Sequence, residues 1–334
     1  MVDKITVEDL GSLMKQRGKD VLEKFGEAAD SGISDPKLLS ILQFVKEYWQ
    51  DNFRPTLASL CCEAVGADKK TANEVGLMIT LTSAGGGIHD DIIDKSFNKH
   101  FRMTVLGLYG LDYSLLVGDL LIIKGWAMAH GLAKNSPDKI SKVIEVFGEW
   151  TVDVCEAEFM EIACVRNIDT DLGQYEKILR QSMADTEACA KLGAIMGQGS
   201  SNQIQALAEY ASDLGFLFRL SNDLNDVTNI EGNLKVRLEN ESVPLPILYA
   251  AKFSQENYVK TKEILSQKII DPQDLMKLLD LCLYSNSFGY VLELAKRNKE
   301  HANKKLLELD DSYARAVLSL ILENSFMDIS RAVE

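Results

Sequence analysis

Two short acidic segments contain the residues most able to perform chemistry. In the first, Asp90, Asp91 and Asp94 follow a long apolar run. Asp90 and Asp94 are four residues apart, so on a helix they share one face. Two carboxylates aimed at one point repel each other unless a positive charge lies between them. Mg²⁺ fits that place, because proteins hold it with one or two carboxylates plus phosphate oxygens.

A second segment repeats the pattern further along the chain. Asn222 and Asp226 are again four residues apart, with Asp223 beside them and an apolar helix face before them. A single acidic segment of this kind is often only a solvated helix end. Two helices that turned such faces toward each other would clamp a metal–diphosphate complex, so the repetition favours a metal site.

Five segments of the chain resemble motifs of the trans-isoprenyl diphosphate synthase (polyprenyl synthetase) family and occur in the family's order. The ordered set is far more specific than either acidic segment alone. The matching segments are Arg54-Pro55, His89 to Asp94, Gly118 to Leu121, Phe218 to Val227 and Leu245 to Ala250.

The resemblance implies a magnesium-dependent prenyltransferase with an all-α fold, a single large helical bundle around a central cavity. In that family Mg²⁺ ions join an allylic prenyl diphosphate to both acidic motifs and stabilise the departing diphosphate. Asp90, Asp94 and Asp226 are the first metal ligands that it implies, and Asn222 can offer an amide oxygen. Asp91 and Asp223 are weaker candidates, and for Asp223 the alternative is a charge on the helix surface.

Several cations with which the family binds isopentenyl diphosphate are replaced here. The family's basic positions fall on residues that include Asp51, Asn52, Ser182 and Ser242, and an upstream histidine falls on Ser83. Replacing lysine by serine or aspartate removes the charge outright, so we expect weak binding of isopentenyl diphosphate.

Some basic residues remain near the implied site. Lys99 and Arg102 are the candidates for a catalytic role. The candidates for substrate binding are Arg54, Lys99, His100, Arg102 and Lys235, with Arg237 in the same segment as Lys235. For each of them the alternative is a solvated surface charge.

Gly85 and Gly86 precede the first motif by about one helical turn. Glycine inside a helix costs roughly 1 kcal/mol relative to alanine, which suggests a reason for its presence. In the family this place forms the floor of the tunnel for the prenyl chain, so both glycines are candidates for substrate binding. Close packing against a neighbouring helix is the alternative.

Three functions are compatible with the retained acids and the lost cations. The first is a divergent prenyltransferase, whose acceptor is isopentenyl diphosphate or an uncharged molecule. The second is a terpene-cyclase-like enzyme on the same fold. The third is a non-catalytic subunit that partners an active prenyl diphosphate synthase. We therefore expect a homodimer, with a heterodimer with another prenyl synthase as the alternative.

Composition narrows the class of protein. The 334 residues are 46% hydrophobic and 26% charged, as in ordinary globular proteins. A formal net charge of −14 argues against nucleic acid as a partner, which requires a basic surface.

We expect no membrane span, because no stretch contains about 18 uninterrupted apolar residues. The six cysteines include no Cys-x-x-Cys pair, and the start of the chain lacks the apolar core of a signal peptide, so we expect a cytoplasmic location.

The elements that must position these residues are helices. The chain has only six prolines, long proline-free runs and almost no strand-like alternation. We predict one domain over residues 1–334, with a loop at 229–242. The predicted helices cover 4–30, 36 onward, 55–65, 69–93, 112–133, 137–165, 172–196, 202–227, 244–253, 258–267, 272–283, 289–307 and 312–332.

Overall fold

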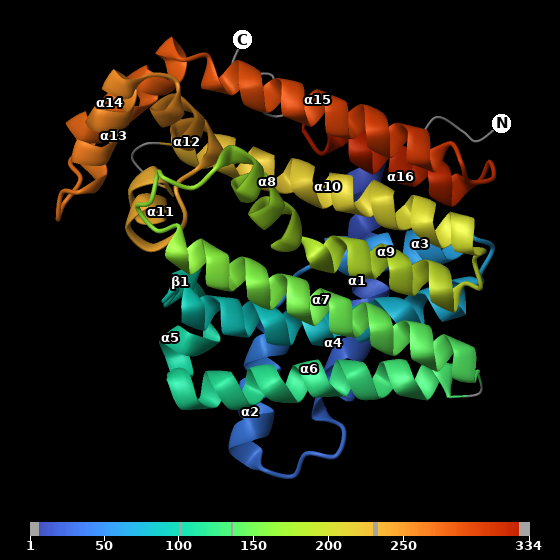
Figure 1. Ribbon diagram of the computed structural model, residues 1–334. Helices are drawn as coiled ribbons and strands as arrows, with labels where there is room; N and C mark the ends of the chain where they lie inside the picture. The colour runs from blue at the N-terminus through green and yellow to red at the C-terminus, as the bar shows by residue number, and fades with distance from the viewer. Residues whose placement is uncertain (1–6, 100–101, 135, 230–232, 327–334) are drawn as a thin grey trace. The chain divides into compact units, whose positions relative to one another are not determined.

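The computed structural model describes residues 7–99, 102–134, 136–229 and 233–326, and almost all of its regular structure is helical (Figure 1). This confirms the all-α prediction. Among the described residues the only strands are β1 (Asn98–Lys99) and β2 (Arg102–Met103), which pair antiparallel. The helices are α1 (Val7–Asp30), α2 (Pro36–Tyr48), α3 (Phe53–Ala64), α4 (Lys69–Ile93), α5 (Val105–Tyr109), α6 (Leu111–Ala133), α7 (Pro137–Ala163), α8 (Leu172–Gln181), α9 (Ala184–Met196), α10 (Ser201–Thr228), α11 (Lys235–Asn240), α12 (Leu245–Lys252), α13 (Gln255–Leu265), α14 (Pro272–Tyr284), α15 (Ser287–Leu306) and α16 (Tyr313–Asn324).

Aspartate caps set several helix starts. Asp35 accepts a hydrogen bond from the Leu38 N–H at 2.8 Å, directly before the proline that begins α2. Asp68 accepts from the Thr71 N–H at 2.8 Å and begins α4. Such caps satisfy backbone donors that a helix start leaves free, typically worth about 1 kcal/mol each. Helix α4, which carries the first acidic motif, has the predicted bounds.

Two predicted elements differ from the structure. The single helix predicted over 172–196 is interrupted after Gln181, where the Ser182 hydroxyl donates to the Leu179 carbonyl at 3.1 Å. Serine hydroxyls compete in this way with the helical hydrogen-bond pattern. The segment predicted as a loop at 229–242 contains the helix α11, in which Arg237 and Leu238 are buried. This helix is too short to show helical periodicity in the sequence.

The chain divides into two compact units, each assembled from three segments of the sequence. The first comprises Met1–Glu149, Ala188–Ala208 and Leu306–Leu320 and contains the first acidic motif. The second comprises Trp150–Glu187, Glu209–Lys305 and Ile321–Glu334 and contains the second motif. The single domain over residues 1–334 stays a prediction, and each unit is described on its own.

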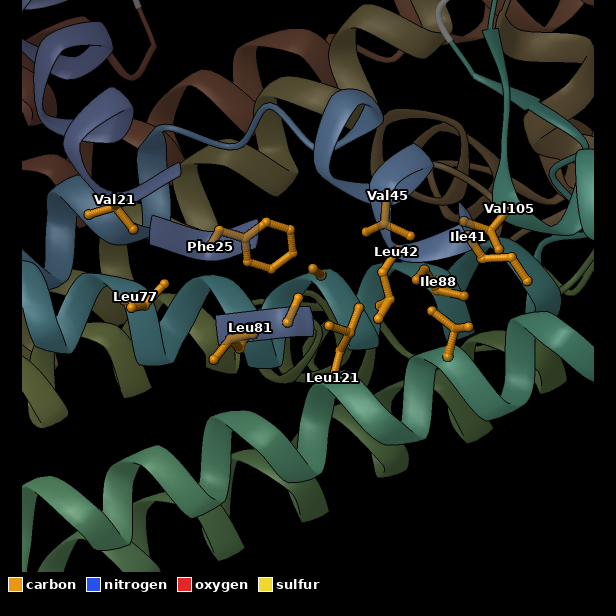
Figure 2. Packing of buried hydrophobic residues seen from close by; sticks show 13 residues of the cluster. Val21, Phe25, Ile41, Leu42, Val45, Leu77, Leu81, Ile88, Val105 and Leu121 are labelled. Atoms are coloured by element: carbon orange, nitrogen blue, oxygen red, sulfur yellow. The ribbon is translucent and has the colours of Figure 1, made fainter. Parts of the chain in front are cut away.

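The core of the first unit surrounds α4. Side chains from α1, α2, α5 and α6 pack around this helix in one buried cluster (Figure 2). Phe25 and Leu121 are completely buried in it. Full burial of such side chains contributes about 1.5–3 kcal/mol each. The labelled members are Val21, Phe25, Ile41, Leu42, Val45, Leu77, Leu81, Ile88, Val105 and Leu121.

Helices α4 and α6 cross at very short distance because glycines lie at their contact. A Cβ atom on Gly85 would lie 2.5 Å from the Gly118 carbonyl oxygen and 2.7 Å from the Ile122 side chain. Gly125 of α6 similarly lies against Thr82. Packing against α6 therefore accounts for Gly85, and the role of Gly85 in substrate binding stays a prediction. Gly86 faces open space, so its role in substrate binding stays a prediction.

Helix α6 is long and apolar enough to cross a membrane by length and composition alone. Its most apolar window has a mean hydropathy of 1.4, and 28% of that window is buried. A single such helix is weak evidence for a span, because the core helix of a globular protein passes the same test.

The two neighbouring glycines give a matched test of the crossing. Gly85→Ala should destabilise the protein by about 1–3 kcal/mol, because the new methyl group meets backbone and the helices must separate. Gly86→Ala should be neutral or stabilise by up to about 1 kcal/mol, because alanine favours the helix and the site is open. Urea denaturation measures both variants. Equal stability of the two would contradict the close crossing.

Candidate functional site

The first acidic motif lies at the carboxyl end of α4. The Asp91 side chain is 4% exposed, and that of Asp90 is 44% exposed. Asp94 is the C-cap residue, and its N–H donates to the Asp90 carbonyl at 2.9 Å. One carboxylate of the pair is therefore buried and its neighbour is half exposed.

Lys99 of β1 reaches back to both carboxylates. Its Nζ lies 3.1 Å from Asp90 Oδ2 and 2.8 Å from Asp91 Oδ1. Burial would lower the pKa of Lys99, but the charges of Asp90 and Asp91 and their hydrogen bonds outweigh it and raise that pKa. Burial raises the pKa of Asp91, and Lys99 opposes this shift. Burial and the Asp91 charge also raise the pKa of Tyr48.

The other candidates near this motif have different surroundings. Arg102 of β2 is directly opposite Lys99 in the strand pair and is exposed. His100 lies outside the described residues. His89 has its Nε2 3.4 Å from the Leu115 carbonyl and 3.4 Å from Asp119 Oδ1, so it links α4 to α6.

Arg54 is paired with Asp51, one of the positions at which we expected a lost cation. Its Nη1 lies 2.9 Å from Asp51 Oδ2, and both side chains are mostly buried. Asp51 Oδ1 also accepts from the Phe53 N–H at 2.8 Å at the start of α3. Asp51 therefore neutralises the positive charge of Arg54 by direct contact.

The second acidic motif occupies the last turns of α10 in the second unit. Asn222 is exposed and Asp226 is partly buried, whereas Asp223 is completely buried. Asp223 accepts from the Leu245 N–H at 2.8 Å, and from Arg237 Nη2 and the Tyr175 hydroxyl at 3.4 Å each. Asp223 is not the surface charge that the alternative supposed, and both of its oxygens have protein donors.

Arg237 is the buried cation that holds this end of the second motif. Its Nε donates to the Ser242 carbonyl at 3.1 Å and its Nη2 to the Ser242 hydroxyl at 3.1 Å, and Glu241 contacts its Nη1. Burial would lower the pKa of Arg237, but Tyr175, Asp223 and Glu241 favour its charged form and raise that pKa. Lys235, the first residue of α11, is exposed.

One further cation beside this motif was not among the sequence candidates. Arg219 Nη2 lies 2.7 Å from Glu161 Oε1, and both side chains are mostly buried. Arg219 is three residues before Asn222 and seven before Asp226, which is the spacing of one helix face. That spacing is the signal that would have identified it.

The donor set fits magnesium only in part. Within the described ranges, no three His, Cys, Asp or Glu side chains are grouped so that they could hold a metal ion. At the first motif, however, two carboxylates already surround one positive group, the Lys99 ammonium. Mg²⁺ commonly takes one or two carboxylates and fills its other positions with water and phosphate oxygens. The residues therefore fit Mg²⁺ together with a diphosphate, in which case Asp90 and Asp94 would hold it in the first unit.

Arg237 and Lys235 give a matched test of the buried anchor, since both belong to α11. Arg237→Met should destabilise the protein by about 3–5 kcal/mol, because it leaves the buried Asp223 without its cation. Lys235→Met, at an exposed position, should change stability by less than about 0.5 kcal/mol. Urea denaturation measures the difference. A stability of Arg237→Met close to that of the wild type would show that the pair is not needed for folding.

Comparisons with known proteins place the chain in a family. The family model described as polyprenyl synthetase matches residues 41–282. A short chain isoprenyl diphosphate synthase of Methanothermobacter thermautotrophicus is 26% identical over 317 residues, covering 91% of this chain and 96% of that protein. A decaprenyl diphosphate synthase from Rhodobacter capsulatus matches the structure with a TM-score of 0.85 at 19% identity, covering 96% and 99% of the two chains.

A third relative is named as a subunit of a heterodimeric enzyme. The large subunit 1 of a heterodimeric geranylgeranyl pyrophosphate synthase of Arabidopsis thaliana is 30% identical over 187 residues, covering 52% of this chain and 50% of that one. The family match extends over most of the chain and includes both acidic motifs. The chain belongs to the polyprenyl synthetase family.

Proposed function

We propose that the protein is a Mg²⁺-dependent prenyltransferase that ionises an allylic prenyl diphosphate and transfers the prenyl group. The observation that carries the proposal is the pair Asp90 and Asp91, which is arranged around a positive group at the end of α4. Family membership supports it, because the relatives are named isoprenyl diphosphate synthases.

The exposure of the residues in the two acidic motifs separates proposed metal ligands from residues that hold the motifs in shape. Asp90 and Asp94 are partly exposed and Asn222 is exposed, so their oxygens suit metal binding. Asp226 is 17% exposed and lies 4.0 Å from Arg237, and we propose it as the ligand of the second motif with that cation beside it. Asp91 and Asp223 are buried and paired, so we assign them to holding the motifs in shape. Bound Mg²⁺ would neutralise the negative charge that grows on the departing diphosphate.

The basic residues near the two acidic motifs differ in how well they can bind a diphosphate. Lys99 and the exposed Arg102 would donate hydrogen bonds to diphosphate oxygens, as charge-assisted contacts. Lys235, in the second unit, is exposed and is the corresponding candidate beside the second motif. Arg54 is already paired with Asp51, so it is the least available of the candidates.

In this proposal the binding site for the prenyl acceptor differs from that of the family. Asp51, Ser182 and Ser242 stand where the family carries basic or neighbouring polar groups, and none of them supplies positive charge. Each lost charge-assisted hydrogen bond is worth roughly 1.5–3 kcal/mol, so two losses weaken diphosphate binding by about a hundredfold or more. We therefore propose a degenerate site for isopentenyl diphosphate and an acceptor that is bound weakly or carries no diphosphate.

Two other functions remain as alternatives. A terpene-cyclase-like enzyme needs no second diphosphate, which suits the lost cations. A non-catalytic subunit of another prenyl synthase also suits them, and one relative is named as part of a heterodimer. The retained ligands Asp90, Asp94 and Asp226 favour an enzyme, because a subunit without catalysis does not need them.

Product analysis separates these functions. Purified protein with Mg²⁺ and allylic diphosphates of increasing length should consume them, and Asp90→Ala should lower the rate by roughly a hundredfold or more. Asp112→Asn, at an exposed position of α6, is the control and should retain the rate. Isopentenyl diphosphate should not increase product formation efficiently.

The possible results are distinct. Linear elongation at low isopentenyl diphosphate concentration would refute the degenerate site. Cyclic products without it would support the cyclase. If the allylic diphosphate stays intact under every condition, the result would support the non-catalytic subunit.

We propose a cytoplasmic homodimer in which α6 takes part in the interface. Leu111, Leu115, Leu116 and Ile123 of this helix are 42–66% exposed. Clustered exposed apolar side chains commonly mark protein–protein contacts. The alternative partner is another prenyl synthase.

Light scattering tests the assembly. The wild type should have the mass of a dimer, and Leu116→Glu together with Ile123→Glu should yield a monomer, because each buries a charge in an apolar contact. Leu307→Glu changes a leucine that is 72% exposed outside α6 and should leave the mass unchanged. A monomeric wild type would contradict the proposal.

A further inference from the structure

We infer that Lys99 is a positioning residue that exchanges partners, and that its contact with Asp90 weakens the binding of Mg²⁺ until a diphosphate is present. The inference rests on the proposed function and deepens it. In the substrate-free protein the Lys99 ammonium neutralises Asp90 and Asp91. When diphosphate arrives, Lys99 turns to it and releases Asp90 to the metal.

The burial of Asp91 makes a cation necessary. Its side chain is 4% exposed, and Lys99 Nζ at 2.8 Å is the cation that contacts it. A buried carboxylate without a partner is costly, so the substrate-free motif depends on Lys99. Asp90, at 44% exposure, shares the same ammonium at 3.1 Å and is the carboxylate that a ligand can reach.

Metal alone and Lys99 compete for the same oxygens. A divalent ion on Asp90 would lie within a few ångströms of the ammonium, where two positive charges repel strongly. A diphosphate changes this balance, since its negative charge attracts both the metal and the lysine. Metal and diphosphate should therefore bind together, while metal alone binds weakly.

The strand pair supplies an independent observation that points to an anion. Lys99 and Arg102 are directly opposite each other in β1 and β2. Like charges directly opposite on neighbouring strands are destabilising. Asp90 and Asp91 contact Lys99, whereas Arg102 is exposed. A diphosphate placed between Lys99 and Arg102 would accept hydrogen bonds from both cations. This favours transfer of Lys99 from the aspartates to the substrate.

Calorimetry with Mg²⁺ alone and with Mg²⁺ plus inorganic diphosphate tests the exchange. Lys99→Gln should bind Mg²⁺ alone about tenfold more tightly than the wild type, because the competing charge is gone. The same variant should bind Mg²⁺ plus diphosphate about tenfold less tightly, because a donor to diphosphate is lost. Lys99→Arg keeps the charge and should resemble the wild type in both titrations.

Lys95→Gln is the matched control. Lys95 lies between α4 and β1, is exposed, and takes part in none of the ion pairs found in the described ranges. It should titrate like the wild type. Equal affinity of Lys99→Gln and Lys95→Gln for Mg²⁺ alone would overturn the inference.

A labelling experiment on the wild type does not depend on the stability of any variant. An amine-acylating reagent followed by mass spectrometry should modify Lys99 more slowly than Lys95 in metal-free protein. Saturating Mg²⁺ alone should accelerate labelling of Lys99, and added diphosphate should slow it again. Labelling of both lysines at one rate without metal would also overturn the inference.

These results separate the two proposals. If Mg²⁺ plus diphosphate binds but Lys99→Gln leaves the affinity for Mg²⁺ alone unchanged, only the exchange is wrong. If the wild type binds no Mg²⁺ even with diphosphate, the proposed function fails as well.

Discussion

The close crossing of α4 and α6 fixes the position of the first acidic motif. Gly85 and Gly118 carry no side chains, so the backbones of the two helices approach to a distance that a single methyl group would prevent. His89 adds a polar contact from α4 to the Leu115 carbonyl at the same end. The helix that carries the first acidic motif therefore packs directly against the Gly118 segment of α6. The buried core cluster around α4 holds this helix in place.

The two motifs share one electrostatic arrangement. In each, the second residue of an adjacent pair is a buried aspartate beside a cation, Asp91 with Lys99 and Asp223 with Arg237. The preceding residue, Asp90 or Asn222, is more exposed. Burying one acid orients the helix end and leaves its neighbour available for a ligand. Each motif thus contains one buried, ion-paired aspartate and one more accessible neighbour.

The sequence predicted the long elements well and the short ones poorly. The long proline-free run predicted α4 with its bounds, because this signal acts locally. The β1–β2 pair, α5 and α11 are too short for periodicity to reveal them. The pairing of Arg54 with Asp51 was also missed: the sequence identified one as a lost cation and the other as a retained one, but not their contact. At Gly85, sequence alone left packing and tunnel open, since either explains a glycine in a helix.

The contact between Ser242 and Arg237 restricts the residues that position 242 can carry. A lysine at position 242 would bring its ammonium into the place where the Ser242 hydroxyl accepts from Arg237 Nη2 at 3.1 Å. Two cations would then be buried side by side, and the acids at this place, Asp223 and Glu241, already pair with Arg237. A positive charge at position 242 would therefore require a change at Arg237, which Asp223 in turn needs. The two positions are thus coupled by epistasis, and a lysine at position 242 is not reached by a single tolerated substitution.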